Sequence, residues 1–229
     1  MSKEWNKTEF ASMLEYSILN PVTLPEEIIK NCSDAIKYGI STVFVHPCYI
    51  KLAVHELSDF NVKPGTVTGY PFGANSTETK AEEARLAVLN GARDIDMVIN
   101  IGALKEGDYY TVETDILAVV ESIRGVEEQF SIIIKAIIET CYLTNSEIIA
   151  ACKLARDGGA NFIETSTDYG TCGAKVEDIQ LIRDTIGDFL KIKASGGIDT
   201  LVKAKNMLEA GADLIGTSSA LSIISEFNK

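Results

Sequence analysis

The stretch SIIIKAIIETCYLTNSEIIAACKLARDGGANFIETST, residues 131–167, contains one complete structural repeat of the chain. An Ile-rich run (131–140) is followed by a segment with apolar residues three and four positions apart (144–159) and by a second apolar run (160–167). The runs are typical of buried strands, and the middle segment is typical of an amphipathic helix that ends at glycine. This order indicates two parallel strands joined by a crossover helix.

The same alternation extends along the whole chain. Short apolar runs rich in Val and Ile occupy residues 15–19, 41–47, 65–71, 94–102, 131–140, 160–167, 191–197 and 213–219. Amphipathic segments occupy residues 24–39, 78–92, 144–159, 176–187 and 200–211. Eight strands in 229 residues predict an α/β fold, a single (β/α)8 TIM barrel domain over residues 1–229. A doubly wound open sheet is the alternative, but no GxGxxG motif supports a dinucleotide site.

The composition excludes several partners. The 33 acidic residues outnumber the 21 basic ones, for a net charge of −12, which argues against nucleic acid and anionic membranes. No apolar run reaches the roughly 20 residues of a membrane span, and the first ten residues have no apolar signal core. Five scattered cysteines without a CxxC pair suit a reducing compartment. We therefore expect a cytoplasmic protein with free thiols.

Charged residues interrupt the predicted strands. They are Asp94, Asp96, Lys135, Glu139, Glu164 and Lys193. In a barrel, inward side chains near the carboxyl ends of strands face the catalytic mouth, and a buried charge costs several kcal/mol unless it is paired. Each residue alone is also compatible with a solvated strand end. Lys135 fits that alternative least, because Ile residues and Ala-Ile-Ile flank it.

Glycine-rich turns end the last two predicted strands. ASGG (194–197) and GTSS (216–219) stand where barrels commonly bind phosphate, and a short helix is expected at 220–227. The chain has no HExxH, HxH or GxSxG motif, so neither a zinc site nor a serine nucleophile is indicated. Carboxylates at 164, 168 and 199 leave Mg²⁺ or Mn²⁺ as a weak alternative. We expect no cofactor and no resident metal.

Six motifs together resemble the deoxyribose-phosphate aldolase family over nearly the whole chain. They are GYPFGANSTETKAEEA, DIDMVINIGALKEGDY, IIKAIIETCYLTNSEI, FIETSTDYGTCGA, IKASGGIDT and IGTSSA. The resemblance implies a (β/α)8 class I aldolase that cleaves 2-deoxyribose 5-phosphate through a lysine Schiff base. It assigns Lys193 as the second lysine and Asp96 as the proton relay. Family members are often dimers or tetramers, so it also implies a homodimer or homotetramer.

The chain departs from that family at the residue that forms the imine. The family's KTST motif on the sixth strand reads ETST here, so Glu164 stands at the place of the Schiff-base lysine. A carboxylate cannot form an imine, and beside Lys193 it would stabilise the ammonium form. Asp168 and Asp199 replace a glycine and a cation of the phosphate site, which disfavours a phosphate dianion.

Three functions follow from this comparison. The first is a lyase or isomerase with a mechanism other than a Schiff base, acting on a small carbonyl or polyol compound with or without phosphate. Its catalytic residues would be Glu164, Lys193, Asp96 and Lys135. The second is a genuine deoxyribose-phosphate aldolase that uses Lys193 or Lys135 as nucleophile. The third is a catalytically inactive homologue with a binding role. The substrate-binding residues are predicted to be Glu15, Ser17, Phe44, Thr165, Asp168, Gly196, Gly197, Asp199, Ser218 and Ser219.

Overall fold

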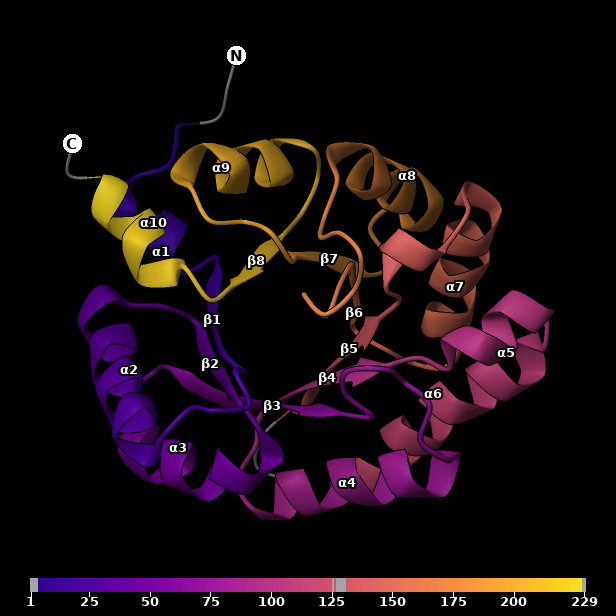
Figure 1. Ribbon diagram of the computed structural model, residues 1–229, viewed down its shortest axis with the longest axis horizontal. Helices are drawn as coiled ribbons and strands as arrows, with labels where there is room; N and C mark the ends of the chain where they lie inside the picture. The colour runs from indigo at the N-terminus through magenta and orange to yellow at the C-terminus, as the bar shows by residue number, and fades with distance from the viewer. Residues whose placement is uncertain (1–3, 125, 127–130, 228–229) are drawn as a thin grey trace.

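The computed structural model describes residues 4–124, 126 and 131–227. Its parallel strands close into a barrel in the order β1 to β8, so the predicted (β/α)8 barrel is confirmed (Figure 1). The strands are β1 Leu14–Ile18, β2 Thr42–Val45, β3 Lys63–Thr68, β4 Asp94–Val98, β5 Ile133–Ile137, β6 Phe162–Glu164, β7 Lys191–Ser195 and β8 Leu214–Thr217.

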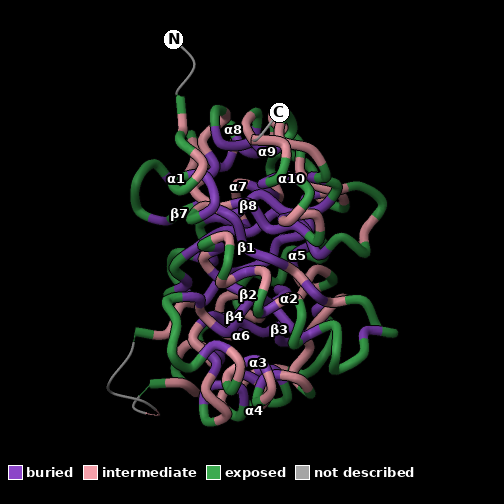
Figure 2. Tube along the Cα trace, turned by 90° about the vertical axis from the view of Figure 1, so that its left-hand side faces the viewer, coloured by how far each residue is buried: buried purple, intermediate pink, exposed green. Residues whose placement is uncertain are grey.

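Helices surround the barrel as an outer ring (Figure 1). The α-helices are α1 Lys7–Ala11, α2 Pro25–Tyr38, α3 Ile50–Leu57, α4 Thr77–Leu89, α5 Ile101–Glu106, α6 Tyr109–Ile123, α7 Asn145–Asp157, α8 Val176–Ile186, α9 Leu201–Glu209 and α10 Ala220–Glu226. Two 3-10 turns, η1 Pro47–Tyr49 and η2 Thr140–Tyr142, follow β2 and β5. The buried residues concentrate in the strands and on the inner faces of the helices (Figure 2).

Local sequence sets several of these boundaries. Thr144 and Glu147 form a capping box at the start of α7, in agreement with the predicted capping segment. Pro25 begins α2, and Gly39 ends it in the left-handed conformation. The run 41–47 gives a strand only as far as Val45, because Pro47 opens η1.

Helices α1, α3, α5 and α6 were not among the predicted segments. Helix α6 begins YYTV, which are residues of low helix propensity, and its helical state depends on packing against α4. None of the helices in the described ranges is long and apolar enough to cross a membrane.

The strand register brings the charged residues together. Asp96 of β4 lies beside Lys135 of β5, and Glu164 of β6 lies beside Lys193 of β7. Glu15 of β1 lies beside Gly216 of β8, where the barrel closes. Because paired residues of parallel neighbours point to the same side of a sheet, these side chains share the barrel interior.

Candidate active site

Six ionisable side chains from five strands meet inside the barrel. We call them the charged cluster, and all six are buried: Glu15, Asp94, Asp96, Lys135, Glu164 and Lys193. If every group were ionised, four carboxylates would face two ammonium groups. Such an excess of buried negative charge favours the uptake of protons by the carboxyl groups.

Lys193 lies among three carboxyl groups. Its Nζ is 3.0 Å from Oε2 of Glu15 and 3.1 Å from Oε1 of Glu164, and it donates a hydrogen bond to Oδ2 of Asp96. Burial by itself would lower the pKa of Lys193, but Asp96, Glu164 and Glu15 together raise it well above its ordinary value. The ε-amine is therefore held as an ammonium, as expected from the position of Glu164 in the sequence.

Lys135 joins the opposite side of the cluster. Its Nζ lies 3.2 Å from Oε1 of Glu15 and 3.3 Å from Oδ1 of Asp96, and it donates to Asp94. Burial opposes its charge, yet these carboxylates raise its pKa as well. Glu15 and Asp96 each bridge both lysines, so the cluster is one connected network.

The ring of Phe44 covers both ammonium groups. Its centroid lies 4.0 Å from Nζ of Lys193 and 4.7 Å from Nζ of Lys135. An aromatic face at this distance stabilises a desolvated cation. Gly65 makes room for the ring, since a Cβ there would lie 2.8 Å from Phe44.

The carboxyl groups of the cluster differ in their affinity for protons. Burial raises the pKa of Glu164 well above its ordinary value, and the nearby charge of Asp96 raises it further. Burial also raises the pKa of Asp94 to about 7, against the attraction of Lys135. The pKa of Glu15 is lowered, because the two lysines outweigh the effect of its burial. Burial therefore favours the protonated form of Glu164, whereas the two lysines favour the ionised form of Glu15.

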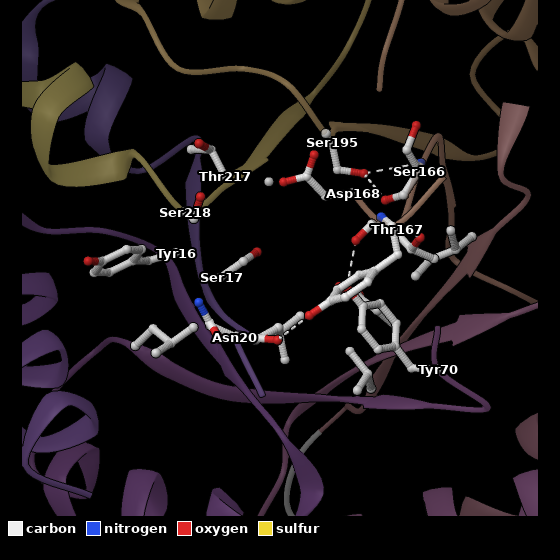
Figure 3. A pocket seen from close by; sticks show the side chains of 18 of the residues that line it. Tyr16, Ser17, Asn20, Tyr70, Ser166, Thr167, Asp168, Ser195, Thr217 and Ser218 are labelled. Atoms are coloured by element: carbon white, nitrogen blue, oxygen red, sulfur yellow. Dashed lines mark hydrogen bonds between the residues drawn. The ribbon is translucent and has the colours of Figure 1, made fainter. Parts of the chain in front are cut away.

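A cavity of about 450 Å³ opens above the cluster at the carboxyl ends of the strands (Figure 3). Asp96 and Glu164 reach it from inside the barrel, whereas Lys193 and Lys135 lie behind them and do not line it. Figure 3 shows Ser17 pointing into the space, with Tyr16 on one side and Ser166 and Asp168 on another. A volume of this size suits a small organic molecule.

Two buried oxygens of the residues that line the cavity have neither a hydrogen bond nor an ion pair among the described residues. They are Oε2 of Glu164 and Oγ of Ser166. A buried polar atom without a partner is costly, and a bound polar ligand removes that cost. The two atoms are therefore candidates for hydrogen bonds with a polar ligand.

The loop after β6 forms one wall of the cavity. Glu139 accepts hydrogen bonds from the amide and hydroxyl of Thr167, and Tyr70 donates to the Thr167 carbonyl. The hydroxyl of Tyr169 donates to the carbonyl of Leu19 at 2.9 Å, which ties this loop to the loop after β1. These contacts hold the loop over the site.

The structure places the predicted site residues in three groups. Lining the cavity are Glu164, Asp96, Ser17, Asp168, Gly196 and Ser218. Buried in or against the charged cluster, behind the cavity, are Lys193, Lys135, Glu15 and Phe44. Away from the cavity are Thr165, Gly197, Asp199 and Ser219.

Each residue of the third group has a partner of its own. Thr165 exchanges hydrogen bonds with the backbone of Ser195, and Gly197 donates its amide to Asp168. Asp199 is exposed and forms an ion pair with Lys203 at 2.9 Å. The amide of Ser219 donates to Thr217. Asp199 is therefore not brought to Glu164, and in the described part of the chain no three His, Cys, Asp or Glu side chains are arranged so that they could hold a metal ion.

Sequence reasoning missed several lining residues. They are Asn20, Asn31, Ser166, Thr167, Ser195 and Thr217. Ser195 could have been predicted, because it follows Lys193 by two positions and so lies on the same side of β7. Asn31 lies on α2 and is held by Tyr16, a contact that no local pattern indicates.

Comparison with known proteins agrees with this architecture. A family model described as DeoC/LacD family aldolase matches residues 6–226. Deoxyribose-phosphate aldolase from Thermoanaerobacter sp. (strain X514) is 45% identical over 219 residues, which cover 96% of this chain and 97% of that protein.

Two solved structures superpose closely on the barrel. QR15, an aldolase, gives a TM-score of 0.90 at 36% identity and covers 96% of each chain. The tetrameric deoxyribose phosphate aldolase from Aeropyrum pernix also gives 0.90, at 24% identity, with 98% of this chain and 93% of that chain covered. With the family model matched from the first helix to the last, the chain belongs to the DeoC/LacD family of aldolases and is a carbon–carbon lyase.

Proposed function

We propose that this enzyme cleaves a β-hydroxy carbonyl compound by a retro-aldol reaction in which Glu164 acts as a carboxylic acid, without a Schiff base. One observation carries the proposal. Glu164 lines the cavity, its buried Oε2 has no hydrogen-bond partner among the described residues, and burial raises its pKa well above the ordinary value. A protonated carboxyl group of this kind donates its proton to a carbonyl oxygen, which is the demand of enol formation.

The proton transfers balance within the two carboxyl groups that line the cavity. Asp96 takes the proton of the β-hydroxyl group, the carbon–carbon bond breaks, and its electron pair moves toward the carbonyl. The carbonyl oxygen takes the proton of Glu164, giving an aldehyde and an enol. Asp96 then returns its proton to the enol carbon, while Glu164 recovers the enol proton. Both side chains end in their starting states.

The two lysines act from behind the cavity. In this scheme Lys193 remains an ammonium 3.1 Å from Glu164, where it stabilises the carboxylate that forms when the proton leaves. Lys135 holds Asp96 and Asp94 in place by charge. Neither lysine needs to lose a proton.

Two other functions would require different properties of the charged cluster. A genuine deoxyribose-phosphate aldolase, the activity in the names of the relatives, would use Lys193 or Lys135 as an imine-forming amine. The raised pKa of both lysines and their place behind the cavity count against it. An inactive homologue with a binding role would have no use for a protonated acid on the cavity wall.

The test measures enol formation and imine formation separately. Proton NMR in D₂O would follow deuterium entry at the carbon next to the carbonyl of acetaldehyde, and intact mass after borohydride would detect an imine adduct. We expect exchange without an adduct, reduced by about 10²–10⁴-fold in Glu164→Gln. Exchange should fall as pH rises through the raised pKa of Glu164, because the acid form is lost.

Each alternative gives a distinct result. A borohydride adduct on Lys193 or Lys135 would restore the imine mechanism. A folded protein that binds carbonyl compounds but catalyses neither exchange nor cleavage would indicate a binding role. Glu164→Lys is the matched variant for the borohydride experiment, since it supplies an amine at the position where the resemblance expects the Schiff-base lysine.

The remaining expectations concern the setting of the enzyme. We propose a homodimer or homotetramer, for which the tetrameric relative from Aeropyrum pernix provides the analogy. The five cysteines are free thiols, which supports a reducing compartment such as the cytoplasm.

A further inference from the structure

Among the described residues, the cavity lining contains acids and no basic side chain. Asp96, Glu164 and Asp168 line it, whereas no Lys, Arg or His within residues 4–124, 126 and 131–227 does. The other polar groups are hydroxyls and amides, including Ser17, Asn20 and Ser218. A bound anion would therefore meet carboxyl groups without a neutralising cation.

Asp168 occupies a backbone donor of the turn that follows β7. Its Oδ1 accepts a hydrogen bond from the Gly197 amide at 3.1 Å, across the turn that follows β7. Asp168 has a φ of +71°, a left-handed conformation that Asp tolerates better than most residues. The chain thus supplies its own carboxylate to an amide of this turn, which is then no longer free to bind an anion.

The first lysine after this turn in the sequence is already paired. Lys203 donates to the carbonyl of Gly197 at 3.1 Å and forms an ion pair with Asp199 at 2.9 Å. It does not line the cavity. The turn therefore presents an amide that is occupied and a lysine that is paired.

Hydroxyl groups find suitable partners along the same wall. The buried Oγ of Ser166 has no hydrogen-bond partner among the described residues, and it lies between Glu164 and Asp168 in the chain. A hydroxyl both donates and accepts, so it satisfies Ser166 and donates to a carboxylate. The phosphate group of a phosphate ester, when it is a dianion, has no proton that it could donate to Asp168.

We propose that the substrate is a short polyhydroxylated aldehyde or ketone without a phosphate group, and that Asp168 is the residue that excludes phosphate esters. This inference rests on the proposed retro-aldol function, because the bound molecule is a substrate only if that reaction takes place. Its claim about binding stands on the cavity lining and on the contact between Asp168 and Gly197.

The test compares a sugar with its phosphate ester by calorimetric titration, using 2-deoxyribose, 2-deoxyribose 5-phosphate and inorganic phosphate. Titrations are made in the Glu164→Gln background, so that nothing is consumed, and are repeated with the native chain. We expect the native cavity to bind 2-deoxyribose at least tenfold more tightly than its 5-phosphate. Tighter binding of the 5-phosphate by the native chain would overturn the proposal.

Two substitutions separate the charge of Asp168 from its occupancy of the amide. Asp168→Gly suits the positive φ, removes the carboxylate and frees the Gly197 amide, so it should reverse the preference and bring in inorganic phosphate. Asp168→Asn keeps an acceptor for the amide but removes the charge, so its gain should be smaller. Asp199→Asn removes a charge outside the cavity and should change the preference less than either.

Failure of this inference is distinguishable from failure of the proposed function. Asp168→Gly without any gain for the 5-phosphate would refute the role of Asp168, whatever the exchange experiment shows. Loss of the non-imine mechanism, with the binding preference intact, would leave the assignment of an unphosphorylated ligand in place.

Discussion

Within the described part of the chain, lysine is buried at two sites, and they differ in how completely the charge is paired. Lys80 of α4 donates to Asp115 of α6 at 2.6 Å and to the carbonyl of Val98 at 2.9 Å. Asp115 in turn accepts from Thr77. This pair matches one cation with one carboxylate and lies outside the cavity.

The charged cluster has the opposite character. Two lysines face four carboxyl groups, and Glu164 keeps an oxygen without a partner. Burial lowers the pKa of Lys80, against the pull of Asp115, whereas the surplus carboxylates raise the pKa of Lys193. A closed pair joins two helices, while a surplus of acid beside a cavity retains a proton that chemistry can use.

The largest effect is expected on the free energy of unfolding, when a buried lysine is removed with and without its partner. Lys80→Met and Lys193→Met should each lower the free energy of unfolding by about 3–5 kcal/mol, since each leaves carboxylate charge buried. Lys80→Met with Asp115→Leu should recover most of the loss. Lys193→Met with Asp96→Leu should not recover the loss. Lys135 then loses its ion pair with Asp96 and remains alone with Glu15 and Asp94. Urea unfolding measures all four variants, and equal recovery at both sites would erase the distinction.

A smaller effect is expected in the pH dependence of stability. The pKa of Asp94 is about 7 in the folded chain against an ordinary 3.8, so the folded state binds more protons between these values. Stability from this group is present at low pH and is lost as pH rises from about 4 to about 7, by roughly 2–4 kcal/mol. Asp94→Asn should flatten this decline in urea titrations at several pH values. The exposed Asp184→Asn controls for loss of one charge, and an unchanged slope in Asp94→Asn would contradict the assignment.

The smallest effect concerns Phe44. Phe44→Leu keeps an apolar side chain but removes the aromatic face from both lysines, at a cost of about 1–2 kcal/mol. Thermal unfolding detects the change. A loss as large as that of Lys193→Met would mean that Phe44 supports the barrel by its volume rather than the lysines by its ring.

Much of the cluster could be predicted because strand sequences leave charges few alternatives. Lys135 sits in a run of Ile and Ala that has no route to water, and Glu164 and Lys193 are on consecutive strands of a parallel barrel. Contacts between loops could not be predicted in this way. Tyr169 reaches Leu19 across 150 residues of chain, and Asp168 reaches Gly197 only because two loops happen to meet at the mouth.

The helices show the same division. Segments with caps and regular apolar spacing, such as α2 and α7, were predicted from local signals. Helix α6 was not, since its first turn has poor helix formers and it is stabilised by tertiary contact with α4.

Gly216 of β8 limits which substitutions β8 and the neighbouring strand β7 can accept. A Cβ at this position would lie 2.4 Å from Cε of Lys193 and 3.2 Å from Cβ of Ser195. Lys193 cannot swing aside without breaking its ion pairs with Glu15, Asp96 and Glu164. Alanine at position 216 is therefore accessible to a descendant of this chain only after a shorter residue has replaced Lys193, and the order of those two substitutions is fixed by space.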